Sequence, residues 1–178
     1  MLEAIVAVYA DWGIGADGTQ PVAVKADRKR FRELTEGAAV IVGRKTLADF
    51  PGGKPLKNRV NIVLTHGPAV AGAVTARSVA EALGEAERRG RTFVIGGERV
   101  YSGLFPHIWR VYVTKLDCKP HSDAFVPNLD ADPAWRVAET GGEQEEGGIR
   151  FRFLTYERAA LCAAGEKFRA CGRDQAAL

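Results

Sequence analysis

The chain has 178 residues, of which 46% are hydrophobic and 26% charged, and its formal net charge is +3. These values are typical of one soluble globular domain with a substantial core. No run of eighteen apolar residues is present, and a strand-like stretch follows Met1 directly, which argues against a transmembrane span or a signal peptide. Three scattered cysteines, Cys118, Cys162 and Cys171, exclude a disulfide framework and lack metal-ligand spacing. We expect a cytoplasmic protein with no metal and no membrane partner.

Basic residues gather in two places, within residues 25–32 and within residues 44–59. Such patches can indicate nucleic acid binding. Few aromatic residues lie among them, and a small anionic ligand explains the charge equally well. We therefore expect no nucleic acid partner.

Strands and helices alternate along most of the chain. Apolar stretches rich in β-branched residues predict buried strands at residues 3–9, 38–42, 59–65 and 92–95, with a shorter strand at 73–75. Helices are expected at 25–36, between Gly43 and Pro51, at 78–89 and around 100–105, and Ser78 is the expected N-cap of the third. Residues 12–18 are typical of a flexible loop. Residues 109–116, 135–139 and 150–156 follow as strands, so the pattern predicts an α/β sheet with antiparallel strands at one edge.

Residues 159–178 differ in composition from the rest of the chain. They are rich in alanine, and Gly165 and Gly172 interrupt any helix. We expect a domain over residues 1–158 and a C-terminal extension, 159–178, that is frayed or weakly docked.

The segment from Gln20 to Thr35 is the first candidate for a functional site. On helical spacing Asp27, Phe31 and Thr35 share one face, so a carboxylate precedes an aromatic ring. The helix dipole alone explains an acidic residue in a first turn. This segment by itself therefore leaves a structural and a functional interpretation open.

Two strand ends carry glycine followed by a helix, a place where α/β sheets bind ligands. Residues 42–46 offer helix N-terminal amides, two cations and a hydroxyl, a combination suited to phosphate. Residues 94–99 offer a second close approach of the backbone to a ligand. Neither stretch has the usual nucleotide-binding glycine pattern, and a tight turn without a ligand explains either one.

Taken together and in order, these elements resemble dihydrofolate reductase over about residues 1–158. The matching elements are Ile5-Val6-Ala7, Gly13-Ile14-Gly15, Pro21 with Asp27 and Phe31, residues 42–46, Leu56 to Arg59, Ile95-Gly96-Gly97 with Val100-Tyr101, and Tyr112-Val113-Thr114. The resemblance implies a single-domain fold with a central, mostly parallel eight-stranded sheet, four flanking helices and an antiparallel strand at the C-terminal edge.

The activity implied by the resemblance is the NADPH-dependent reduction of 7,8-dihydrofolate to tetrahydrofolate. A hydride moves to pterin C6 and N5 gains a proton, in support of one-carbon metabolism and nucleotide synthesis. The expected partners are dihydrofolate and antifolate inhibitors, and the expected state is a monomer.

The resemblance also implies roles for individual residues. Asp27 and Thr114 are the implied catalytic residues, and Asp27 is expected to have a raised pKa. The implied substrate contacts, besides these two, are Ile5, Val6, Ala7, Arg28, Phe31, Phe50, Leu56, Arg59, Ile95 and Tyr101. The implied NADPH contacts are Ala7, Ile14, Gly15, Gly43, Arg44, Lys45, Thr46, Leu64, Thr65, His66, Arg77, Ile95, Gly96, Gly97, Glu98, Arg99, Val100 and Tyr101, and the Gly96–Gly97 peptide is expected to be cis.

Two positions depart from the family pattern, and both flank Asp27. Val22 stands where a tryptophan that helps to order water near the pterin is usual, and Arg28 replaces a residue that is usually apolar. We expect the first change to affect water placement and the second to add a cation for the glutamate tail. Reduced sensitivity to diaminopyrimidine antifolates such as trimethoprim is a further expectation.

Alternative functions remain at this point. The related reductase of riboflavin synthesis, which acts on a ribosylated pyrimidine, shares the fold, but Asp27 in its family position speaks against it. A protein that keeps NADPH without turnover is the second alternative. RNA binding by the basic residues around Asp27 is the third, and it would show a steep salt dependence.

Overall fold

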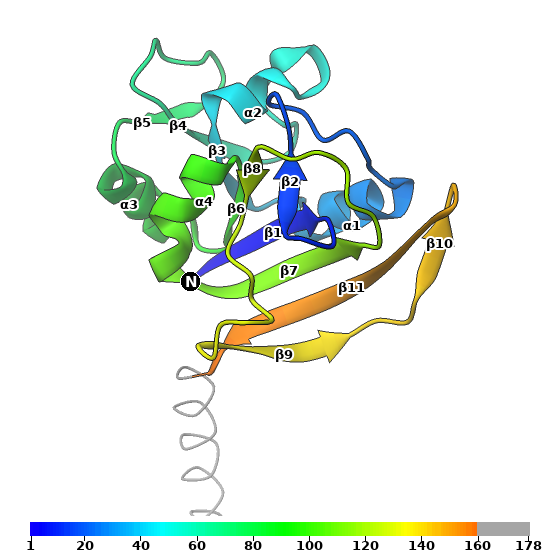
Figure 1. The fold of residues 1–178 in the computed structure, drawn as a ribbon. Coiled ribbons are helices and arrows are strands. Elements are labelled where there is room, and N and C mark those ends of the chain that lie inside the picture. Colours follow the sequence, from blue (N-terminus) through cyan, green and yellow to red (C-terminus); the bar gives the residue numbers. More distant parts are fainter. Residues whose placement is uncertain (160–178) are drawn as a thin grey trace, which may run out of the picture.

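The computed structural model describes residues 1–159, so all but the first residue of the expected C-terminal extension lies outside the described part (Figure 1). The main sheet has the order β10–β11–β7–β1–β6–β3–β4–β5, and β9 also pairs with β11. Its strands are β1 (Leu2–Val8), β3 (Ala39–Gly43), β4 (Val60–Leu64), β5 (Val74–Ala76), β6 (Thr92–Gly96), β7 (Ile108–Leu116), β9 (Trp135–Thr140), β10 (Gln144–Glu146) and β11 (Ile149–Arg158). The helices are α1 (Lys25–Thr35), α2 (Arg44–Ala48), α3 (Val79–Arg89) and α4 (Glu98–Leu104), with two 3₁₀ turns, η1 (Pro51–Gly53) and η2 (Phe105–His107).

The expected α/β fold class is confirmed. The strands from β7 to β5 run parallel, and β11 pairs antiparallel with β7. The main sheet has nine strands, one more than expected, because β9 and β10 both pair with β11 on the side away from β7. Among residues 1–159, no helix combines the length and apolar character that crossing a membrane requires.

Helices cover both faces of the sheet (Figure 1). Side chains of α3 and α4 join one apolar cluster with Val6 and Val8 of β1. Side chains of α1 and α2 join a second cluster that includes Ile5 of the same strand. Neighbouring residues of a strand point to opposite faces, so β1 contributes to both clusters.

The segment expected to be a flexible loop, residues 12–18, is instead anchored. Gly13–Gly15 form strand β2, which pairs with β8 (Ala124–Phe125), and the Trp12 side chain is only 3% exposed. The amide of Asp17 donates to Asp123 Oδ2 at 3.0 Å. The glycine pattern indicated the turn correctly, but partners more than one hundred residues away order it.

Helix α1 is fixed at both ends by distant side chains. Its N-cap residue, Val24, has no side-chain oxygen to accept a bond, and Glu146 of β10 accepts from the amides of Lys25 (2.6 Å) and Ala26 (3.2 Å). At the other end, Arg59 donates to the carbonyl of Arg32 at 3.2 Å. The helix that carries Asp27 therefore has a defined position against both β10 and the start of β4.

Helix α3 begins as its sequence predicts. The Ser78 hydroxyl accepts from the amide of Glu81 at 3.1 Å, which confirms Ser78 as the N-cap.

Candidate active site

Asp27 lies in the first turn of α1 and faces strand β7. Thr114, which is fully buried in β7, donates from its hydroxyl to Asp27 Oδ1 at 2.6 Å. Burial raises the pKa of Asp27, and the Thr114 hydrogen bond and the charges of Arg30 and Arg28 only partly oppose that effect. The site thus holds a carboxyl group that keeps its proton at a higher pH than an exposed aspartate does.

Arg30 is a neighbour of Asp27 that sequence reasoning missed. Its guanidinium donates to the carbonyl of Val113 at 3.0 Å and lies 4.5 Å from the ring centroid of Phe153. Burial lowers the pKa of Arg30, and the charge of Asp27 opposes that effect. A signal was present in the sequence, because Arg30 lies three residues after Asp27 and so shares its side of the helix.

Apolar side chains expected to line the cleft do come together in the structure. Five of the predicted substrate contacts belong to one apolar cluster, namely Ile5, Phe31, Phe50, Leu56 and Ile95. Val6 is different, because its side chain packs in the cluster on the opposite face of the sheet. Ala7 lies against a third small cluster, which also contacts Val22 and Ala26. Of these three residues of β1, Ile5 is therefore the one whose side chain joins the expected apolar wall.

Tyr101 connects helix α4 with strand β1, which carries Ile5 of the apolar wall. Its hydroxyl donates to the carbonyl of Ile5 at 2.7 Å. Burial and the nearby charge of Asp27 both raise the pKa of Tyr101, so its proton stays in place. Tyr101 is therefore a neutral donor that connects helix α4 to β1.

Two glycine-bearing strand ends meet, as the parallel sheet requires. Strands β3 and β6 are neighbours, and Val42 is in register with Gly96. The Gly96–Gly97 peptide is cis. A Cβ on Gly97 would lie 2.9 Å from Thr46 Oγ1, and a Cβ on Gly43 would lie 3.0 Å from Val100 Cγ2. A larger residue at either position would require Thr46 or Val100 to shift. The two glycine motifs therefore lie side by side at one edge of the sheet and contact the helices that follow them.

Cations surround the loop after β4. Arg77 donates to the carbonyls of Thr65 (3.0 Å) and Gly67, and Arg44 donates to the carbonyl of Pro68 at 2.5 Å. The structure thus brings the predicted residues Arg44, Thr65 and Arg77 together, with the exposed His66 between them in the chain. The arrangement offers two guanidinium groups to an anion.

The remaining predicted cofactor residues lie on several elements. Lys45 and Arg99 are exposed, Leu64 ends β4, and Ile14 and Gly15 lie in β2. Glu98 is already engaged, because its Oε1 accepts from the amide of Phe125 at 3.0 Å. Its carboxylate therefore ties α4 to β8.

Arg59 and Arg28 differ in the exposure of their side chains. The side chain of Arg59 is only 7% exposed and pairs with Glu36 Oε2 at 3.2 Å, whereas Arg28 is exposed. The charge of Arg28 acts on Asp27, which places the two groups near one another.

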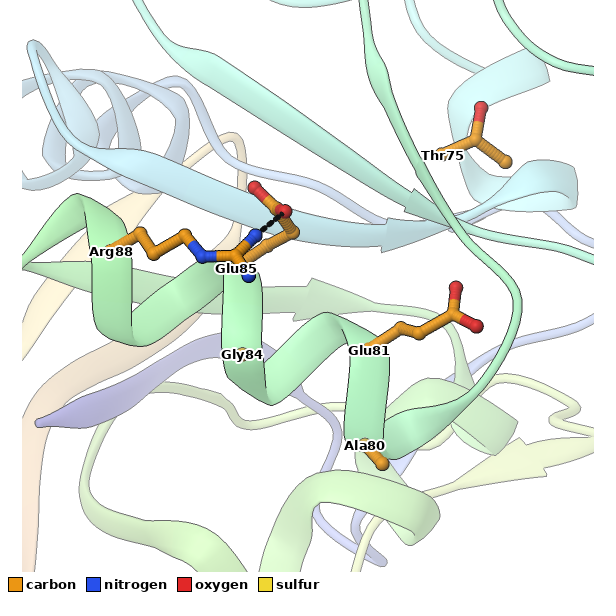
Figure 2. A pocket seen from close by; sticks show the side chains of 6 residues that line it. All are labelled: Thr75, Ala80, Glu81, Gly84, Glu85 and Arg88. Atoms are coloured by element: carbon orange, nitrogen blue, oxygen red, sulfur yellow. Dashed lines mark hydrogen bonds and ion pairs between the residues drawn. The ribbon is translucent and has the colours of Figure 1, made fainter.

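A separate hollow of about 390 Å³ is lined by residues of α3 and by Thr75 of β5 (Figure 2). Glu85 and Arg88, which line it, pair with each other, and Glu81 accepts from the amide of Arg77. The residues that line it, from β5 and α3, are separate from those around Asp27 and Thr114. Its charges satisfy one another, so it adds nothing to the site.

The site as a whole is therefore that of an α/β protein with a proton-holding carboxyl group against an apolar wall, next to a glycine-lined and cationic strand end. A family model described as dihydrofolate reductase matches residues 1–158. The chain belongs to the dihydrofolate reductase family.

Individual relatives agree with this family. A dihydrofolate reductase of Bacillus subtilis (strain 168) is 33% identical over 169 residues, which cover 93% of this chain and 99% of the relative. One of Mycobacterium tuberculosis (strain H37Rv) is 35% identical over 153 residues, or 82% of this chain and 91% of the relative. The solved structure of a dihydrofolate reductase from Enterococcus faecalis, complexed with NADP(H) and RAB-propyl, has a TM-score of 0.80 at 32% identity and covers 89% of this chain and 96% of that chain.

Proposed function

We propose that this protein catalyses the NADPH-dependent reduction of 7,8-dihydrofolate to 5,6,7,8-tetrahydrofolate. The observation that carries the proposal is the contact between Asp27 and the buried Thr114 hydroxyl, with the raised pKa of Asp27, at an apolar wall. Family membership and the NADP(H) complex of the Enterococcus faecalis relative support it.

The residues at the strand ends fit the cofactor. Gly43 and Gly97 are the N-cap residues of α2 and α4, so the N-terminal amides of both helices lie at the neighbouring ends of β3 and β6. We assign Gly96, Gly97 and Val100, with Lys45, Thr46 and Arg99, to the pyrophosphate. Arg44 and Arg77, with Thr65 and His66, are assigned to the 2′-phosphate, which favours NADPH over NADH. Ala7, Ile14 and Tyr101 border the nicotinamide in this assignment.

When bound, the cofactor supplies the hydride that reduces pterin C6. The protein's own contribution is to hold the reacting ring in an apolar site and to provide a proton at N5. As a carboxylate, Asp27 accepts hydrogen bonds from the pterin N3 and amino group, and in its protonated form it holds the proton that reaches N5 through water. Thr114 fixes the orientation of Asp27 Oδ1.

The substrate's remaining parts are assigned to the apolar wall and to two arginines. Phe31, Phe50 and Leu56 contact the ring system and the benzoyl part, and Arg59 receives the α-carboxylate of the glutamate tail. The exposed Arg28 adds a second cation at the cleft mouth. Arg28→Leu should weaken the binding of tailed folate and leave a simple pterin unaffected, and equal effects on both would contradict this role.

Further parts of the proposal concern the cell. We propose a cytoplasmic monomer that supplies tetrahydrofolate for one-carbon metabolism and binds antifolates. Val22 and Arg28, on either side of Asp27, are proposed to reduce its sensitivity to diaminopyrimidines such as trimethoprim. The comparisons favour neither the pyrimidine reductase nor a non-catalytic NADPH-binding protein.

A steady-state assay tests the reaction. Loss of NADPH absorbance is followed with dihydrofolate, with the ribosylated aminopyrimidine as the competing substrate, and with NADH in place of NADPH. We expect turnover with dihydrofolate and a preference for NADPH. The absence of turnover with dihydrofolate, or a preference for the pyrimidine, would overturn the proposal.

A further inference from the structure

Arg59 has few donors left for a ligand. Its Nε donates to Thr35 Oγ1 at 2.8 Å, Nη1 donates to the carbonyl of Lys57 at 2.7 Å, and Nη2 donates to the carbonyl of Arg32 at 3.2 Å. Nη2 also pairs with Glu36 Oε2 at 3.2 Å. A guanidinium has five N–H groups, and three of those of Arg59 donate to protein oxygens while the Glu36 carboxylate lies at ion-pair distance from Nη2.

Glu36 is the one charged acceptor in this set, and it is held in place. Asn58 Nδ2 donates to Glu36 Oε1 at 2.8 Å, and the Glu36 amide donates to the carbonyl of Arg32 at 3.0 Å. The Glu36 side chain is nevertheless 47% exposed, so its carboxylate has access to water. The other acceptors around Arg59 are neutral and hold its guanidinium against the C-terminus of α1.

We infer that Glu36 is a specificity-determining residue that competes with the tail carboxylate of the substrate for Arg59. The inference rests on the proposed function, in which Arg59 receives that carboxylate. A bidentate carboxylate needs one N–H from each terminal nitrogen. Nη2 donates to the carbonyl of Arg32 and lies 3.2 Å from Glu36 Oε2, so a carboxylate that approaches Nη2 meets the negative charge of Glu36. The tail must therefore displace Glu36 or bind Arg59 beside a second negative charge.

The consequence is selective for the tail. Glu36 lowers the affinity for ligands that carry the α-carboxylate and does not act on the pterin ring, which lies against Asp27 at the other end of α1. Removal of its charge should therefore strengthen the binding of tailed ligands only.

The test is Glu36→Gln, which keeps an oxygen acceptor for Asn58 and removes the charge. Dissociation constants are measured on the NADPH-bound protein for folate and for a tailless pterin, and kcat is measured with dihydrofolate. We expect folate to bind about 2- to 5-fold more tightly, as for a partly exposed ion pair, with the pterin affinity and kcat unchanged. Equal changes for both ligands, or no change for folate, would overturn the inference.

Glu33→Gln is the matched control, because Glu33 is exposed on the same helix and pairs with Lys29 at 3.9 Å. The same gain in the control would mean a general charge effect and would also overturn the inference. Arg59→Lys tests the assignment of Arg59 separately from the role of Glu36, because lysine lacks the forked geometry of the guanidinium. If Arg59→Lys leaves folate binding unchanged, the tail binds elsewhere and both the Arg59 assignment and this inference fail. Turnover of dihydrofolate by the native protein would still support the proposed reaction.

Discussion

Replacement of Tyr9 by phenylalanine removes a single oxygen that organises the segment before Asp27. Tyr9 follows β1 and is fully buried. Its hydroxyl accepts from the Val22 amide at 3.1 Å and donates to the Val22 carbonyl at 3.2 Å. The backbone of Val22 is therefore held by the side chain of the residue that directly follows β1.

The expected loss of stability follows from the two hydrogen bonds between Tyr9 and Val22. Each hydrogen bond of this kind contributes about 0.5–1.5 kcal/mol, so their joint loss should lower the free energy of unfolding by about 1–3 kcal/mol. Denaturant unfolding at pH 7 measures this difference between the native protein and Tyr9→Phe. A loss below about 0.5 kcal/mol would refute the reasoning, because it would mean that both Val22 groups find other partners at no cost.

Hydrogen exchange gives a local readout in the same two proteins. The Val22 amide should exchange faster in Tyr9→Phe, since its acceptor is gone. The amides of Lys25 and Ala26, which Glu146 holds, serve as internal controls and should keep their rates. Unchanged exchange at Val22 would likewise contradict the assignment.

Three further predictions concern α1, the sheet and Asp27. Glu146→Ala should lower the free energy of unfolding by about 0.5–2 kcal/mol, because it removes the N-terminal cap of α1. Glu145 lies on the same strand and is exposed, so Glu145→Ala is the control. An equal loss in the control would contradict the capping role of Glu146. Glu3 is 4% exposed and accepts hydrogen bonds from Arg91 and Tyr112. Glu3→Ala should therefore lower the free energy of unfolding in denaturant by about 1–3 kcal/mol, and an unchanged value would refute the role of these two hydrogen bonds. The raised pKa of Asp27 means that the folded state favours the protonated form of this carboxyl group. Its contribution to the free energy of unfolding is complete below the ordinary aspartate pKa and is lost as the pH rises through the raised pKa. Asp27→Asn should therefore gain stability relative to the native protein as pH rises through that range, and parallel stability curves for the two proteins would contradict it.

The central strands could be predicted from sequence because their pattern is local. Strands β1, β3 and β6 are short continuous apolar runs, typical of strands buried on both faces. Strand β10 has the sequence Gln-Glu-Glu and no apolar residue, so nothing in its composition predicted it. Its pairing with β11 and the capping of α1 by Glu146 depend on contacts between distant parts of the chain.

In the site, too, local patterns could be predicted from sequence and contacts between distant residues could not. Helical spacing placed Asp27 and Phe31 on one face, but only the family resemblance connected Asp27 with Thr114, because 87 residues separate them. Arg30 was hidden in a run of cations that is typical of a solvated helix face, and its acceptor lies on β7. The ion pair between Arg59 and Glu36 was missed because it depends on how the start of β4 packs against the end of α1.

The most direct test of the central claim is a single-turnover measurement of hydride transfer with NADPH deuterated at nicotinamide C4. The account predicts that the native protein places the deuterium on C6 of tetrahydrofolate, and that Asp27→Asn transfers it about 100- to 10,000-fold more slowly. Product without deuterium at C6, or a native-like rate in Asp27→Asn, would contradict the account.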